Sequence, residues 1–149
     1  AYLIIRGLRT LDTRLKQHFE NTKKVINFLK KQKKIKEILY PHNPSSKNYK
    51  LWKKYYSGAN GLFSIVIKSK KKSSVIKFVN SLELFGIGYS WGGFESLAIL
   101  QELRGNTKYT KIRRYLRFDK DEHIVRLHIG LEDPNDLIQD LKRSIKFIK

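Results

Sequence analysis

HIVRLHIGLEDPNDLIQDLKRSIKFI, residues 123–148, carries the clearest pattern of secondary structure in this chain. Its first seven residues alternate in polarity, and one face of the predicted strand carries three apolar side chains: Val125, Leu127 and Ile129. A helix is expected directly afterwards, because Asp133 can act as the N-cap and Pro134 suits the first helical position. The spacing of the later apolar residues predicts one buried stripe on this helix: Leu137, Ile138, Leu141, Ile145 and Ile148. The stretch therefore predicts a strand and a helix that share one core.

The segments before it predict further elements of the same layer. Apolar residues at steps of three and four predict a long amphipathic helix over about residues 8–31. The run GLFSIVIK predicts a strand over residues 61–68 with alternating faces. Shorter elements are expected as follows: a strand over 35–40, a helix over 46–57, a helix from Ser73 with Val75, Ile76, Val79 and Leu82 inward, and a strand over 84–89. Residues 101–122 are expected to be mostly loop, so the sequence predicts an α+β fold, a small sheet covered on one face by helices.

The composition is that of one strongly basic domain. The chain has 149 residues, with Lys+Arg 32 against Asp+Glu 13 and a net charge of +19. Such a field attracts polyanions, so a basic nucleic-acid-binding module is one interpretation. Most of the basic residues are lysine, however, and no zinc-finger, helix-turn-helix or RNA-recognition signature is present. We therefore expect mainly solvated lysine faces, with no more than nonspecific attraction to nucleic acid.

Several kinds of site find no support in the residue types. The chain has no cysteine, and the spacing of its four histidines does not match a metal motif: His18, His42, His123 and His128. No apolar run approaches the roughly 20 residues that a membrane helix needs, and no signal-peptide pattern opens the chain. We expect no metal, no membrane span and a cytoplasmic location.

The residues GYSWG, 88–92, fit the G-x-S-x-G pattern in which a sharp turn presents a serine nucleophile. Partners occur later in the order of an α/β-hydrolase, namely Asp119 or Asp121 and then His123 or His128. An oxyanion loop of the HGGG type is absent from the 89 residues before Ser90. A glycine turn with an ordinary serine is therefore favoured over a nucleophile.

Arg126 is the one arginine inside the otherwise core-like run IVRLHIG. A buried guanidinium is costly unless it meets an anion or a polar network. Its planar fork suits bidentate binding of a carboxylate in a cleft. The alternative is an arginine on an edge strand that points to solvent.

Four ordered segments resemble one family: IRGLRTLDTRLKQH (5–18), SGANGLFSIVI (57–67), GYSWGGFESL (88–97) and VRLHIGLEDPNDLIQDL (125–141). They are similar to the C-terminal part of the Cys/Met-metabolism pyridoxal-phosphate enzymes, and the tryptophan of Y-S-W-G-G is typical of the cystathionine β-lyase branch. The resemblance implies the C-terminal domain of a fold-type I enzyme, with a mostly antiparallel sheet. It also implies that Arg126 binds the substrate carboxylate, that Ser90 positions the reacting groups, and that Trp91 and Tyr89 line the substrate pocket. Arg9 and Arg14 are expected to pair structurally.

In this family a lysine forms a Schiff base with pyridoxal 5'-phosphate, and its segment lies before the point where this sequence begins. The resemblance therefore implies that residues 1–149 are a substrate-clamping domain without the cofactor-binding domain, inactive alone and binding no cofactor alone. The complete enzyme would split cystathionine into homocysteine, pyruvate and ammonia in methionine biosynthesis. Possible partners are an N-terminal half or further copies of the chain. A non-functional remnant is a further alternative.

Overall fold

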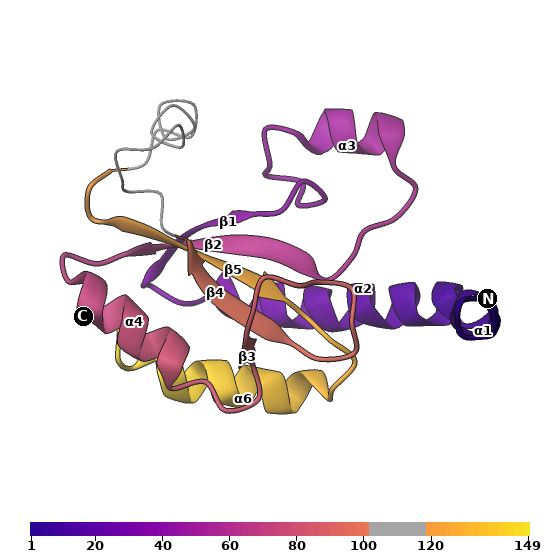
Figure 1. Ribbon diagram of the computed structural model, residues 1–149. Coiled ribbons are helices and arrows are strands. Elements are labelled where there is room, and N and C mark those ends of the chain that lie inside the picture. The colour runs from indigo at the N-terminus through magenta and orange to yellow at the C-terminus, as the bar shows by residue number, and fades with distance from the viewer. Residues whose placement is uncertain (102–118) are drawn as a thin grey trace, which may run out of the picture.

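The computed structural model describes residues 1–101 and 119–149, which form a five-stranded sheet and helices (Figure 1). The strand order is β1-β2-β5-β4-β3, and only the β3–β4 pair is parallel. The strands have these bounds: β1 (Ile35–Leu39), β2 (Leu62–Lys68), β3 (Gly86–Ile87), β4 (Leu97–Gln101) and β5 (Glu122–His128). The prediction of an α+β fold with a mostly antiparallel sheet is confirmed.

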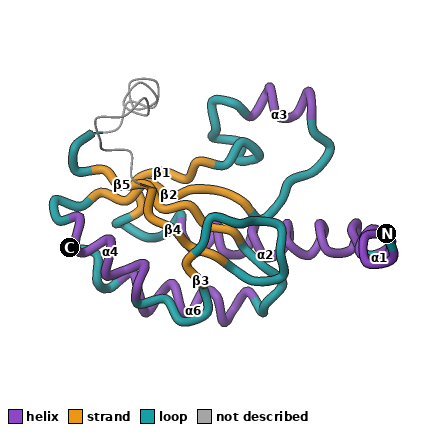
Figure 2. Tube along the Cα trace, viewed as in Figure 1, coloured by secondary structure: helices purple, strands orange, loops and turns teal. Residues whose placement is uncertain are grey.

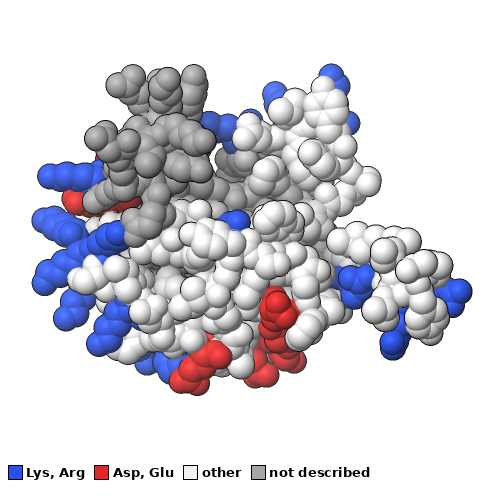
Figure 3. All heavy atoms as spheres, in the orientation of Figure 1, with Lys and Arg blue, Asp and Glu red and all other residues white. Residues whose placement is uncertain are grey.

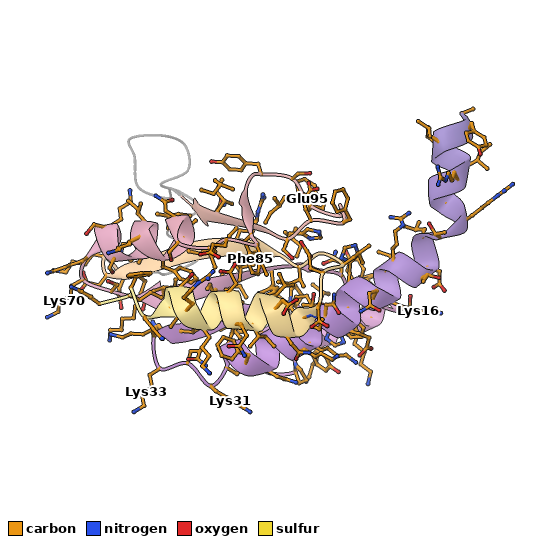
Figure 4. The ribbon with its side chains drawn as sticks, turned by 90° about the horizontal axis from the view of Figure 1, so that it is seen from below. Lys16, Lys31, Lys33, Lys70, Phe85 and Glu95 are labelled. Atoms are coloured by element: carbon orange, nitrogen blue, oxygen red, sulfur yellow. The ribbon has the colours of Figure 1, made fainter. Side chains whose placement is uncertain are left out.

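Three helices cover one face of the sheet, as two views at right angles show (Figures 1 and 4). They are α2 (Leu11–Leu29), α4 (Lys72–Asn80) and α6 (Pro134–Ile145), while α1 (Tyr2–Arg9) and α3 (Tyr49–Tyr55) project from the body. The buried core beneath them includes alternate residues of the two central strands: Phe63, Ile65, Ile67, Val125 and Leu127. Alternation therefore places the predicted apolar faces against the helices.

The predicted long helix over 8–31 is interrupted. The backbone of Thr10 leaves the helical region at φ −111° and ψ 7°, which separates α1 from α2. The carbonyl oxygen of Gly7 accepts hydrogen bonds from the Thr10 hydroxyl (3.4 Å) and from Arg14 Nη2 (2.6 Å). These bonds satisfy a carbonyl that the end of a helix leaves without an intrahelical partner. The structural role expected for Arg14 is confirmed.

Helix α4 turns a different face inward from the one expected. Val75 and Val79 are buried as predicted, but Ile76 is 40% exposed and Phe78 is fully buried in its place. Val75, Phe78 and Val79 have the i, i+3, i+4 spacing of one helical face. Ile76 lies outside this face.

Two predictions around β3 and β4 were also inaccurate. Only Gly86 and Ile87 of the predicted strand 84–89 pair with a neighbour, and strand β4 was not predicted. The expected loop over 101–122 lies mostly outside the described residues, although Gln101 ends β4 and Glu122 begins β5.

The junction between β5 and α6 forms as the sequence predicts. The Asp133 carboxylate accepts a hydrogen bond from the Asn135 amide (2.7 Å), and Pro134 opens the helix. Further along α6, the buried Asp140 carboxylate accepts the amides of Glu83 (3.0 Å) and Leu84 (2.8 Å). Helix α6 thereby holds the chain that leads into β3.

A hydrogen-bonded clamp ties the loop between β3 and β4 to this junction. The Glu132 carboxylate accepts the amide of Ser96 (2.6 Å) and its hydroxyl (2.8 Å), and the Ser96 oxygen accepts the amide of Gly130 (2.8 Å). We call these three residues the Ser96–Glu132–Gly130 clamp. The loop arches beside the C-terminal end of β5 (Figure 2), so the clamp places residues 88–95 at that end of the sheet.

Helix α2 binds the same junction from the other side. His18 Nδ1 lies 2.8 Å from the carbonyl oxygen of Ile129. The Asn21 amide donates to the carbonyl oxygens of Gly130 (3.1 Å) and Glu132 (2.9 Å). Backbone groups at the end of β5 are therefore bonded from two directions.

Replacing Gly130 with alanine should destabilise the protein strongly. A Cβ at this position would collide with the Phe94 carbonyl oxygen and with a Glu132 carboxylate oxygen, and would lie 2.7 Å from the Glu95 carbonyl carbon. We expect the free energy of unfolding in urea to fall by about 2–4 kcal/mol, because the clamp cannot close around the added methyl group.

Gly58→Ala is the matched control, because nothing lies within 4 Å of a Cβ at Gly58. It should change the free energy of unfolding by less than about 1 kcal/mol. Equal effects of the two substitutions would show that the junction around Gly130 is not tightly packed.

Candidate functional site

The loop of residues 88–96 presents two aromatic side chains at the surface. Tyr89 is 68% exposed and Trp91 is 61% exposed. Gly92 follows with a φ of +80°, a left-handed conformation that residues with a Cβ rarely adopt. A glycine is therefore required for the chain to turn at this point of the loop.

Arg126 meets these aromatic residues from the middle of the sheet. Strand β5 pairs on both sides, with Ser64 of β2 and Ile99 of β4 opposite Arg126, so the edge-strand alternative is wrong. Arg126 Nη2 donates a hydrogen bond to the carbonyl oxygen of Tyr89. The guanidinium carbon lies 5.7 Å from the ring centres of both Tyr89 and Trp91. Both distances lie within the range of cation–π attraction.

The Arg126 guanidinium has no carboxylate partner among the residues that the structure describes. One of its donors is bonded to Tyr89, and the aromatic rings lie close to its charge. The remaining donors of a guanidinium can still bind a carboxylate with two parallel hydrogen bonds. This arrangement is chemically suited to a small molecule that carries a carboxylate group.

Ser90 lies exposed between Tyr89 and Trp91. The hydrolase alternative finds no support. Its possible triad partners Asp119, Asp121 and His123 lie at the start of β5. His123 Nε2 contacts the carbonyl oxygen of Ser69 (3.1 Å) there. At about 3.3 Å per residue, the length of β5 separates that end from the loop. The expected glycine turn therefore fits the structure better than a catalytic triad does.

His128 lies at the loop end of β5, and its bonds go to the backbone of the loop. Its Nε2 is 3.1 Å from the Gly92 amide nitrogen and 3.1 Å from the Gly93 carbonyl oxygen. Burial lowers the pKa of His128, the bond to Gly93 opposes this effect, and nearby His18 lowers the pKa further. Through these two contacts, His128 holds the backbone of Gly92 and Gly93 in place.

Sequence reasoning missed three residues that position the site: Ser96, Glu132 and His18. Their partners lie 36 residues away for Ser96 and Glu132, and 111 residues away for His18 and Ile129. No local pattern signals such contacts. The only hint was the occurrence of Ser96 and Glu132 within the segments GYSWGGFESL and VRLHIGLEDPNDLIQDL.

Other features of the described residues lie away from this site. A groove of about 860 Å³ runs along β1 and residues 43–48, but none of the four predicted site residues lines it. No cluster of three or more metal-ligating side chains occurs in residues 1–101 and 119–149. Within the same ranges, every helix is too short or too polar to cross a bilayer.

Many of the described basic side chains on the face shown in Figure 3 gather at the opposite end of the sheet, and others lie on α1 and α3. Figure 3 shows lysine and arginine side chains along the side where β1 begins and β2 ends. Lys31, Lys33 and Lys70 point outward there, away from Glu95 of the loop (Figure 4). The candidate site therefore lies apart from these lysines.

Known proteins match nearly the whole chain. The family model for Cys/Met metabolism PLP-dependent enzymes matches residues 1–146. The chain is 39% identical to cystathionine beta-lyase MetC of Escherichia coli over 95% of this chain and 35% of that protein. It is also 39% identical to the L-alanine/L-glutamate racemase of Wolbachia pipientis, over 97% of this chain and 35% of the racemase.

A solved structure has the same fold. It is a crystal structure from Campylobacter jejuni of a protein named as an O-acetylhomoserine (thiol)-lyase, with pyridoxyl-lysine phosphate bound. The TM-score is 0.75 at 32% identity, over 97% of this chain and 31% of that one. The chain thus spans about a third of the length of the relatives that it matches. From the family match along almost its entire length, we conclude that the chain belongs to the Cys/Met metabolism PLP-dependent enzymes.

Proposed function

We propose that this chain is the C-terminal, substrate-clamping domain of a PLP-dependent enzyme that breaks a carbon–sulfur bond of cystathionine. The observation that carries the proposal is the Arg126 guanidinium, which has no carboxylate partner in the described residues and lies beside Tyr89 and Trp91. Several relatives at 37–39% identity are named as cystathionine beta-lyases, which supports this reaction. The products would be homocysteine, pyruvate and ammonia.

In this proposal Arg126 binds the α-carboxylate of the amino-acid substrate. Two parallel hydrogen bonds would fix the substrate in one orientation, so that its Cα–H bond points in one direction for proton removal. Since β5 is hydrogen-bonded on both sides, its backbone provides a rigid base for this side chain. The bond from Nη2 to the Tyr89 carbonyl further limits the rotation of the guanidinium.

The loop residues would complete the substrate pocket. Tyr89 and Trp91 flank the guanidinium and would exclude water from the ion pair, which strengthens the attraction between the two charges. Ser90 lies between them with an exposed side chain, where its hydroxyl can hydrogen-bond to the reacting groups. Ser90 then positions groups and does not attack an acyl carbon.

These residues fit the substrate side of a pyridoxal-phosphate site, because a carboxylate-binding cation is what an amino-acid substrate requires. Pyridoxal phosphate, when bound, supplies the electron sink that this chemistry needs. We propose that the cofactor is held by a part of the protein outside this chain. Residues 1–149 alone would then bind no cofactor and show no activity.

The apolar surface of α1 supports such an arrangement. Five large hydrophobic residues of this helix are 50–75% exposed: Tyr2, Leu3, Ile4, Ile5 and Leu8. Helix α1 projects from the body, and no residue of it is buried. Contiguous apolar surface of this kind is typical of a contact with another protein part. We propose that the cofactor-carrying part packs here.

A second candidate reaction is racemisation of an amino acid, which the similarity to the Wolbachia racemase favours. An α-carboxylate and a labile Cα–H bond are common to both kinds of substrate. Arg126 would therefore serve either reaction in the same way. The complete gene product should be assayed for pyruvate release from cystathionine and for racemisation of L-alanine and L-glutamate. The lyase proposal requires the first activity to exceed the second.

The other expectations from the sequence stay predictions. A nucleic-acid role would require binding that persists at physiological salt with a steep salt dependence. A remnant without function would show neither enzymatic activity nor specific binding. The cytoplasmic location and assembly with an N-terminal half or with further copies are likewise predictions.

Arg126→Ala should lower kcat/KM of the complete, cofactor-loaded gene product by about 30- to 1,000-fold. This range corresponds to the loss of a charged hydrogen-bonded contact worth about 2–4 kcal/mol. Steady-state kinetics of pyruvate release from cystathionine would measure the effect.

Lys68→Ala serves as the control, because Lys68 is exposed at the end of β2 that pairs with Glu122, far from the loop. Its kcat/KM should stay within about twofold of the wild type, as for a surface substitution. If Arg126→Ala behaved like Lys68→Ala in an active enzyme, Arg126 would not bind the carboxylate.

Ile4→Lys should have different effects in the 149-residue chain and in the complete gene product. Ile4 is 69% exposed in this structure, so the change should leave the unfolding free energy of the chain within about 0.5 kcal/mol. In the complete gene product the same change should destabilise by about 1–3 kcal/mol, because an apolar contact is lost and a charge is buried. Urea unfolding of both forms would measure this.

Lys24→Ala offers a comparison, since Lys24 is exposed on α2. It should be close to neutral in both forms. An Ile4→Lys change that is neutral in the complete gene product would mean that α1 is not a contact surface.

A further inference from the structure

Two histidines lie buried beneath the loop that carries Ser90 and Trp91. His18 of α2 and His128 of β5 are each 3% exposed. Their ring centres are 5.3 Å apart, with 46° between the ring planes. None of the roles proposed above uses either imidazole as a titratable group.

The proton of His18 is fixed by its partner. His18 Nδ1 lies 2.8 Å from the carbonyl oxygen of Ile129, and a carbonyl can only accept, so Nδ1 carries the hydrogen. In the neutral ring, Nε2 then has a lone pair. This atom is buried and has no hydrogen-bond partner in the described residues. Neutral His18 would therefore keep a buried nitrogen acceptor without a partner in the described residues.

His128 has two alternative partners for one nitrogen. Its Nε2 lies 3.1 Å from the Gly92 amide, which can only donate, and 3.1 Å from the Gly93 carbonyl, which can only accept. Nε2 can accept from Gly92 only when it has no proton, and it can donate to Gly93 only when it has one. The two bonds therefore exclude each other.

The neutral ring makes the first of these bonds when its proton is on Nδ1. With Nε2 unprotonated, the neutral ring has its proton on Nδ1, which is buried without a partner in the described residues. The Gly92 amide then donates to the lone pair of Nε2. Protonation of the ring puts a hydrogen on Nε2, removes that acceptor and leaves only the bond to Gly93.

We propose that His128 is a positioning residue whose protonation exchanges the Gly92 bond for the Gly93 bond and so shifts Ser90 and Trp91 relative to Arg126. The bonded residues directly follow Trp91, and Gly92 is at its left-handed turn. A change of partner there rotates the peptide groups that hold the loop. The loop shift itself does not depend on the reaction, whereas its effect on catalysis rests on the proposed function.

The surroundings of His128 lower its pKa, so the exchange of hydrogen bonds is expected below neutral pH. Burial lowers the pKa of His128, the Gly93 bond raises it, His18 lowers it, and Glu132 and Glu95 raise it, with a net lowering from 6.5. The neutral form is therefore the resident one at pH 7. Because the unfolded chain takes up this proton more readily than the folded chain does, stability falls as the pH drops below about 6.5.

Nuclear magnetic resonance on the complete, cofactor-loaded gene product tests this proposal. ¹⁵N-labelled histidine reports the protonation of His128, and ¹⁹F-labelled tryptophan reports the surroundings of Trp91, with Trp91→Phe used only to assign its signal. Between pH 8 and pH 5 the Trp91 signal should move along the same titration curve as His128 Nε2, with a midpoint below 6.5.

His128→Gln is the decisive variant, because its amide can donate or accept at the same place but does not titrate. The Trp91 signal should lose its pH dependence while the protein stays folded. If His128→Gln does not fold, the coincidence of the two curves in the wild type still decides the matter. His42→Gln is the matched control: His42 lies 4.5 Å from Trp52, so only the Trp52 signal should change its titration.

The kinetic consequence is a difference between two pH profiles. In the wild type, kcat/KM should fall by up to about tenfold per pH unit below the midpoint of the His128 titration. This decrease in kcat/KM should be absent in His128→Gln. A Trp91 signal that ignores the titration of His128, or one that still titrates in His128→Gln, overturns the inference. Absence of lyase and racemase activity would instead overturn the proposed function and leave the two titration curves interpretable.

Discussion

The Glu132 carboxylate, bonded to both the amide and the hydroxyl of Ser96, is the interaction on which this end of the molecule depends. It joins the loop between β3 and β4 to the turn between β5 and α6, and the close approach leaves no room for a Cβ at Gly130. Helix α2 docks on the same turn through His18 and Asn21. Three parts of the chain thus meet around a few backbone groups, which are nearly all satisfied by hydrogen bonds, as a buried backbone requires.

This clamp explains how an exposed loop can serve a precise site. The side chains of Tyr89 and Trp91 are largely exposed. They nevertheless lie close to Arg126, because the loop is fixed at Ser96 and at Gly92–Gly93. Arg126 is held on the central strand of the sheet. Relatives named as a lyase and as a racemase are equally similar to this chain, at 39% identity.

The large net positive charge of the chain acts differently from the single charge of Arg126. With a net charge of +19, the like charges of the protein repel one another, and Lys31, Lys33 and Lys70 extend outward at the end of the sheet away from the loop. Glu122 at that end is buried and pairs with Lys36, which lowers the pKa of Glu122. The candidate site depends on one arginine in a defined place, and the overall charge does not identify it.

Most of the local elements, including β2, β5 and α6, could be predicted from the sequence, because alternation, helical spacing and the Asp133–Pro134 capping pattern act within a few residues. The local pattern drew attention to Arg126 and Ser90, and the resemblance to a known family added Tyr89 and Trp91 to the candidate site; their roles are proposals. Only the tertiary structure decided that β5 is central, that Phe78 replaces Ile76 in the core, and that helix 8–31 breaks at Thr10. The clamp and the histidine pair were beyond sequence reasoning for one reason: their hydrogen bonds join residues up to 111 positions apart, and only the folded topology brings such residues together.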